Sequence, residues 1–102
     1  MTIIKQLSEK ISDEIEDASE YAKLALKFKD KDRSASDTFY SLAQDEMRHS
    51  MMLHAEVTKL IEEYRKTNGE PPEKMQAVYD YLHEREIEAA EKVKRYLAMY
   101  KE

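Results

Sequence analysis

The chain has 102 residues, of which 38% are charged, with 17 basic and 22 acidic side chains and a net charge of −5. This length fits one domain, and the lack of cysteine excludes disulfides, thiolate chemistry and Cys-based zinc or iron–sulfur sites. Charges of both signs are mixed along the chain, so a nucleic-acid partner is not expected. No apolar run approaches the roughly 20 residues of a membrane span, and the N-terminus lacks a signal-peptide core. We therefore expect a cytoplasmic protein, in which carboxylates and imidazoles would hold any transition metal.

Two short polar breaks divide the chain into three long segments that favour helix. The composition is rich in Glu, Lys, Ala, Leu and Met and contains a single Gly. The first break surrounds residues 29–34, where Asp32 or Ser34 could cap the helix that follows. The second contains Gly69, which suits a left-handed position after a helix, and Pro72, which suits the first turn of the next. We predict an all-α fold, an antiparallel helical hairpin plus a third helix, with helices at about 3–29, 34–67 and 72–100.

Each predicted helix carries an apolar stripe with alternating spacings of three and four residues, which is typical of a helix that faces a bundle core. In the second helix this stripe contains Phe39, Leu42, Leu53, Val57, Leu60 and Tyr64. The main polar breaks in the three stripes are Glu14, Glu46, His49 and Glu86. A buried carboxylate is unfavourable unless it is paired or bound to a cation. The pattern therefore predicts that these residues bind a metal ion. The alternative is that the glutamates lie at the margin of a wider apolar stripe, where their side chains reach water.

Glu46 and His49 lie three residues apart, on one face of a helix. Inward-facing di-iron and di-manganese sites in helical bundles use this spacing. If the first two helices fold back about a turn centred near residue 31, Glu14 faces position 48, between Glu46 and His49. At about 1.5 Å rise per residue, the three side chains then lie within roughly one helical turn of each other. We predict that Glu14, Glu46 and His49 bind a metal ion.

Glu86 and His83 form a weaker candidate pair in the third predicted helix. Reflection about a second turn near residue 70 places Glu86 opposite position 54, about 8–12 Å from the level of Glu46 and His49. His83 lies one turn earlier and meets the same difficulty. We keep both as possible metal ligands, with a structural or supporting role slightly favoured.

A set of residues in the first two predicted helices forms a pattern known from other proteins: Glu14, Tyr21 and the run Leu42-Ala43-x-x-Glu46-x-x-His49. This pattern resembles the ferritin-like superfamily in its rubrerythrin branch, and residues 45–52 are similar to the second helix of encapsulated ferritins. The resemblance covers residues 5–65. It implies a ferritin-like four-helix core with a di-iron centre that oxidises Fe(II) with O₂ or peroxide. Manganese is a possible alternative metal, and the ligand types do not exclude zinc. The resemblance also implies that Tyr21 hydrogen-bonds a ligand or takes part in electron transfer.

The chain departs from that family in having three predicted helices instead of four and one Glu-x-x-His motif instead of two. A di-iron centre of this class uses four carboxylates and two histidines. Two-fold pairing of Glu14, Glu46 and His49 would supply that set, so we predict a homodimer or higher homo-oligomer with two metal ions at each shared site. Residues 98–102 do not resemble the apolar tail that targets cargo to encapsulin shells, so storage in such a shell is not expected.

Two other functions remain open from the sequence. The chain could be a non-enzymatic oligomerisation or adaptor module, in which the carboxylates of the stripes pair with Lys or Arg of a partner helix. It could also be an inactive relative in which a bound cation only stabilises the fold.

Overall fold

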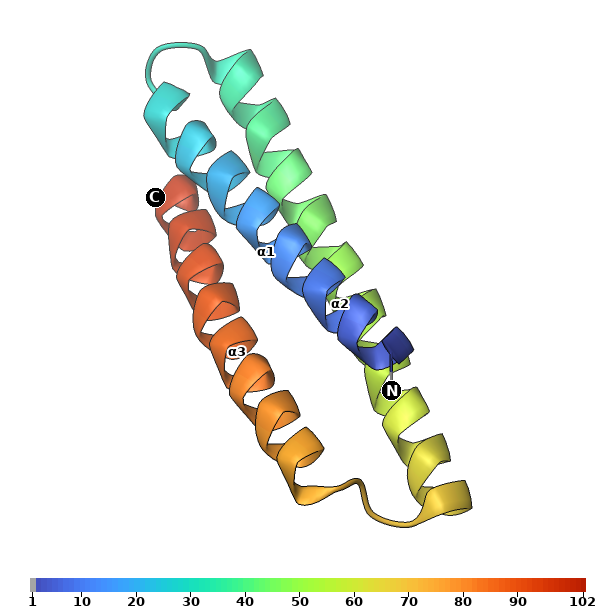
Figure 1. Ribbon diagram of the computed structural model, residues 1–102. Coiled ribbons are helices and arrows are strands. Elements are labelled where there is room, and N and C mark those ends of the chain that lie inside the picture. Colours follow the sequence, from blue (N-terminus) through green and yellow to red (C-terminus); the bar gives the residue numbers. More distant parts are fainter. Residues whose placement is uncertain (1) are drawn as a thin grey trace.

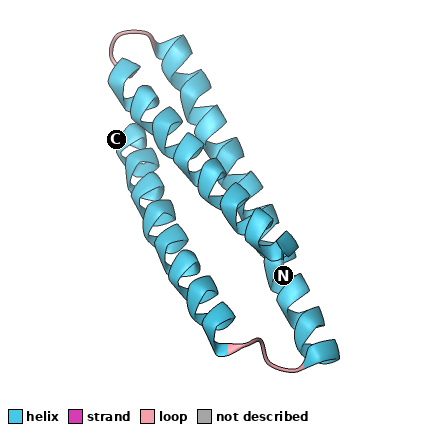
Figure 2. Ribbon diagram, viewed as in Figure 1, coloured by secondary structure: helices cyan, strands magenta, loops and turns pink. Residues whose placement is uncertain are grey.

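The computed structural model describes residues 2–102, which form three α-helices joined by two short turns (Figures 1 and 2). The helices are α1 (Thr2–Phe28), α2 (Arg33–Asn68) and α3 (Glu73–Lys101). Each helix end lies within one residue of the predicted position, and the all-α class is confirmed. The three helices form a rod with extents of 55 × 18 × 18 Å. Within residues 2–102, no helix combines the length and apolar character needed to cross a membrane.

The turns end and begin the helices by local hydrogen bonds. The Asp32 side chain accepts a hydrogen bond of 3.1 Å from the Ala35 amide and so caps α2. Gly69 follows α2 with φ of 77°, as predicted, and its amide donates to the Arg65 carbonyl at 3.1 Å. Pro72 lies just before α3 instead of in its first turn. Its ψ of 143° is extended while its carbonyl already accepts from the Gln76 amide at 3.0 Å, which is the geometry of a residue that precedes a helix.

Helix α1 lies between the other two, antiparallel to α2 and parallel to α3 (Figure 1). The backbones of α2 and α3 hardly approach each other. Long side chains bridge the space between them: the rings of Tyr40 and Tyr100 stack with centroids 4.5 Å apart, and those of His54 and His83 with centroids 4.9 Å apart. The fold is therefore a tight α1–α2 hairpin with α3 laid along one side of it.

Small side chains mediate the contact of α2 with its neighbours. Ser36, Ala43 and Ser50 are buried and recur every seven residues. The hydroxyl of Ser36, which has no exposed surface, donates a hydrogen bond of 2.6 Å to the Ala25 carbonyl of α1. Small residues at such a contact let the two helix axes come close together.

The apolar stripe predicted for α2 is only partly buried. Of its members Val57 is buried. The larger side chains stay half-buried on a neighbouring face of α2, and they are Phe39, Leu42, Leu53, Leu60 and Tyr64. Leu53 and Leu60 still pack against the buried core, whereas Phe39 and Leu42 are not part of that cluster.

Candidate metal centre

Glu14 of α1 and the Glu46–His49 pair of α2 meet near the middle of the hairpin. Each of the three residues offers one ligand atom, and these atoms all lie within 4.8 Å of one another. The Nδ1 atom of His49 is 3.7 Å from Oε2 of Glu14 and 3.9 Å from Oε2 of Glu46. The antiparallel hairpin and the three-residue spacing on α2 bring these groups together, as the sequence predicted. One histidine nitrogen and two carboxylates thus converge without any residue from α3.

The electrostatics of this group favour a cation. The side chains of Glu14 and Glu46 are only 26% and 19% exposed, whereas that of His49 is 45% exposed. Oε2 of Glu14 is buried and has no hydrogen-bond partner. Two partly desolvated carboxylates held close together are unfavourable unless positive charge compensates them. Oxygen and imidazole donors of this kind fit iron, manganese or zinc, so the residues present fit the predicted metal.

The candidate centre lies on the side of the hairpin that α3 does not cover. The clefts between α1 and α3 are lined on α1 by Ile4, Ser8, Ser12, Ile15, Glu16 and Ser19. Because α-helical residues are 100° apart, Glu14 points about 140° away from the middle of that set. On α2, Glu46 and His49 likewise point about 130° away from Tyr40 and His54, whose rings contact residues of α3.

We call the uncovered side of the hairpin the open face. Its residues on α1 and α2 share a half-buried position, apart from the more exposed His49, and they are Glu14, Tyr21, Phe28, Phe39, Leu42, Glu46, His49, Leu53 and Leu60. Tyr21 stacks on Phe39 with ring centroids 6.3 Å apart, and Phe28 meets the same ring at 6.1 Å. The polar group of the candidate centre is thus set among large apolar side chains. Tyr21 lies two turns from Glu14 along α1, on the same side of the helix.

Glu86 and His83 do not join the three residues of the candidate centre. The His54–His83 pair places Glu86 about level with residue 51, whereas the Tyr40–Tyr100 pair places it level with residue 54. Glu86 is therefore about one to two helical turns from the level of Glu46 and His49, a range that overlaps the expected offset. Glu86 nevertheless lies on α3, beside Ser12 and Ile15 of α1, on the covered side of the hairpin.

Glu86 is buried, with 9% of its surface exposed. Burial raises the pKa of its carboxyl to about 7. His83 has a buried Nδ1 atom without a hydrogen-bond partner, and its ring stacks on His54 and Tyr79. Burial, and then the neighbouring His83, lower the pKa of His54. The pairing of His54 with His83 was not predicted, although reflection about the second turn places the two residues near the same level.

Comparison with models of known protein families, with curated proteins and with solved structures found no match to this chain.

Proposed function

We propose that the chain is a ferritin-like metalloprotein that binds Fe(II) through Glu14, Glu46 and His49 and oxidises it with O₂ or peroxide. The observation that carries this proposal is the convergence of the three ligand atoms within 4.8 Å. The buried Oε2 of Glu14, which lacks a hydrogen-bond partner, supports it because a bound cation would satisfy that atom.

The proposal includes a second copy of the chain, because one chain supplies only half of a di-iron ligand set. Bundle centres of this class use four carboxylates and two histidines. A two-fold axis through the open face would bring Glu14, Glu46 and His49 of one protomer opposite the same residues of its partner. The proposed centre then has the full set, and two α1–α2 hairpins form the four-helix core.

The composition of the open face supports this assembly. Large apolar side chains such as Phe39 and Leu42 are left half-buried around the ligands and are not part of the core cluster of the chain. Burial of that surface by a second copy is favourable, and it would exclude water from the centre. Helix α3 packs on the other side of the hairpin, so it leaves the approach of the partner free.

In this proposal each residue of the group has a distinct role. The carboxylates of Glu14 and Glu46 would hold the ions and offset their charge, and His49 would supply a nitrogen ligand. Fe(II) is the substrate, and it gives up electrons to O₂ or peroxide at the shared centre. Tyr21 stands near enough along α1 to influence a ligand through its hydroxyl or to pass an electron, and that role stays a prediction.

Oxygen consumption after addition of Fe(II) to purified protein tests the activity. We expect uptake of O₂ by the native chain and its loss in Glu46→Ala and His49→Ala. His54→Ala and Glu62→Ala are matched controls, because each removes the same residue type from α2 outside the group, and both should keep the activity. If native protein binds Fe(II) but consumes no oxidant, the proposed oxidase activity is wrong. The bound cation would then only stabilise the fold.

The adaptor alternative has a different signature. A non-enzymatic module would bind no metal, and its Glu14, Glu46 and His49 would pair with cationic residues of a partner. Anaerobic titration with Fe(II) or Mn(II) distinguishes the two functions, because only the proposed metalloprotein shows saturable binding that depends on His49 but not on His54.

A further inference from the structure

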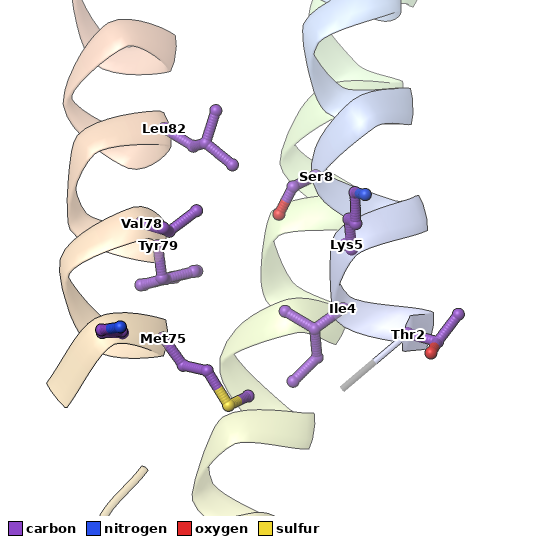
Figure 3. Close-up of a pocket in the computed structure, with 9 residues that line it drawn as sticks. Thr2, Ile4, Lys5, Ser8, Met75, Val78, Tyr79 and Leu82 are labelled. Atoms are coloured by element: carbon purple, nitrogen blue, oxygen red, sulfur yellow. The ribbon is translucent and has the colours of Figure 1, made fainter. Parts of the chain in front are cut away.

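A cleft of about 540 Å³ opens between the N-terminal ends of α1 and α3, away from the candidate metal centre (Figure 3). Ile4 and Ser8 of α1 face Val78 and Leu82 of α3 across it. Its volume falls in the range of about 300–1,000 Å³ that is usual for small-molecule sites.

The walls of the cleft are mostly apolar. Met75, Val78, Tyr79 and Leu82 of α3 line one side, and Thr2 and Ile4 of α1 line the other. Val78 is 59% exposed, which leaves a branched aliphatic side chain in water at the mouth of the cleft. Ser8 is only 5% exposed and directs its hydroxyl into the cleft (Figure 3). An aliphatic ligand placed here would remove apolar surface from water mainly on the α3 side, because Ile4 is only 7% exposed.

The charged residues that line the cleft are both cationic, although the chain as a whole has a net charge of −5. They are Lys5 of α1 and Lys74 of α3. The parallel course of α1 and α3 also brings two helix N-termini to this end, and each carries partial positive charge. Pro72 precedes α3 and provides no side-chain acceptor for the first amides of the helix. Positive charge at the rim and apolar walls inside complement a molecule with an anionic head and an aliphatic tail.

We propose that this cleft binds a single medium-chain carboxylic acid. The aliphatic tail lies between Ile4 and the Val78–Leu82 side of α3, and the carboxylate faces Lys5 and Lys74. This inference does not depend on the proposed metal centre, because the cleft lies on the α3 side of the hairpin and shares no residue with Glu14, Glu46 and His49.

Calorimetric titration of metal-free protein with decanoate, kept below its micellar concentration, tests the proposal. We expect saturable binding with one site per chain, and at least tenfold weaker binding when Lys5→Gln and Lys74→Gln are combined. Lys94→Gln, a lysine of α3 outside the cleft, should bind as the native chain does. Decyltrimethylammonium, which has the same tail and the opposite charge, should bind at least tenfold more weakly than decanoate.

A second pair of variants tests the location. Val78→Asp places a carboxylate at the exposed mouth of the cleft and should abolish decanoate binding, whereas Val78→Asn should weaken it only a few-fold. Circular dichroism of both variants checks that the helices persist. Equal binding of the two amphiphiles, unchanged binding in the double lysine variant, or the absence of saturable binding to the folded native chain would overturn the proposal.

Discussion

On the open face of the α1–α2 hairpin, Glu14 and Glu46 converge on His49, whereas on the covered side Glu86 of α3 lies beside Ser12 and Ile15 of α1 without joining a comparable group. Glu86 is the more buried residue, with 9% of its surface exposed against 26% and 19% for the side chains of Glu14 and Glu46. Burial raises the pKa of the Glu86 carboxyl to about 7, so this residue can lose its charge instead of binding a cation.

The difference shows that burial of a carboxylate does not identify a metal centre. The open face differs because three donor groups from two helices lie close together there. The cleft on the covered side is lined by Glu86 and Glu16 together with the cationic Arg85 and Lys92, and within residues 2–102 no group of three ligand atoms converges there. Substitutions on the two sides should therefore have different and separable effects on assembly, metal binding and stability.

The largest expected effect concerns the open face itself. Leu42→Asp places a charge among its apolar side chains, and an unpaired charge in an interface costs about 3–5 kcal/mol. We therefore expect dimerisation to weaken by at least about 100-fold, with the helical content unchanged. Met52→Asp is the matched control, because Met52 is 66% exposed and points away from both the open face and α3. Sedimentation equilibrium measures both; a dimer that survives Leu42→Asp would show that another surface forms the interface.

On the covered side, substitution of Glu86 should change the free energy of unfolding, and the size of the change should depend on pH. Since the pKa of Glu86 is about 7 in the folded chain against 4.5 ordinarily, folding takes up a proton between these values. The stability contributed at this site is therefore highest below pH 4.5 and falls as the pH rises through 7. We expect Glu86→Leu to raise the free energy of unfolding at pH 8 by on the order of 2–3 kcal/mol, with little gain at pH 4.

Urea unfolding of the native chain and of Glu86→Leu at the two pH values measures this effect. Glu86→Gln should also flatten the pH dependence, because it removes the ionisable group while keeping the shape. A loss of metal binding in Glu86→Gln would contradict the separation of the two sides and would return Glu86 to the metal centre.

A smaller effect is expected in the turn between α1 and α2, which belongs to neither the open face nor the covered side. Asp32→Ala removes the side-chain acceptor of the Ala35 amide and should lower the free energy of unfolding by about 1 kcal/mol. Asp32→Asn keeps an acceptor and should lose less. Metal affinity of the folded protein should be unchanged in both variants. A large change in affinity would mean that the end of the hairpin controls the geometry of Glu14 and Glu46.

The sequence predicted the helices and the candidate ligands because both depend on local spacing and on one short turn. Glu14 faces Glu46 and His49 across a single turn, so an error of one residue in the centre of that turn shifts their relative level by two residues, which is less than a helical turn. The place of Glu86 was harder to predict because it depends on the second turn and on the side of the hairpin that α3 covers. The side of the hairpin that α3 covers could not be predicted, since apolar residues occupy both faces of α2 and the choice depends on how closely Ser36, Ala43 and Ser50 pack.

The most direct test of the account is the metal content and solution mass of native protein purified without chelator. We predict a species of twice the chain mass that carries about two iron or manganese ions per dimer. The same preparation of His49→Ala should be free of metal, whereas His54→Ala should retain it. A metal-free monomer that fails to take up Fe(II) under anaerobic conditions would contradict the proposal that Glu14, Glu46 and His49 form half of a shared metal centre.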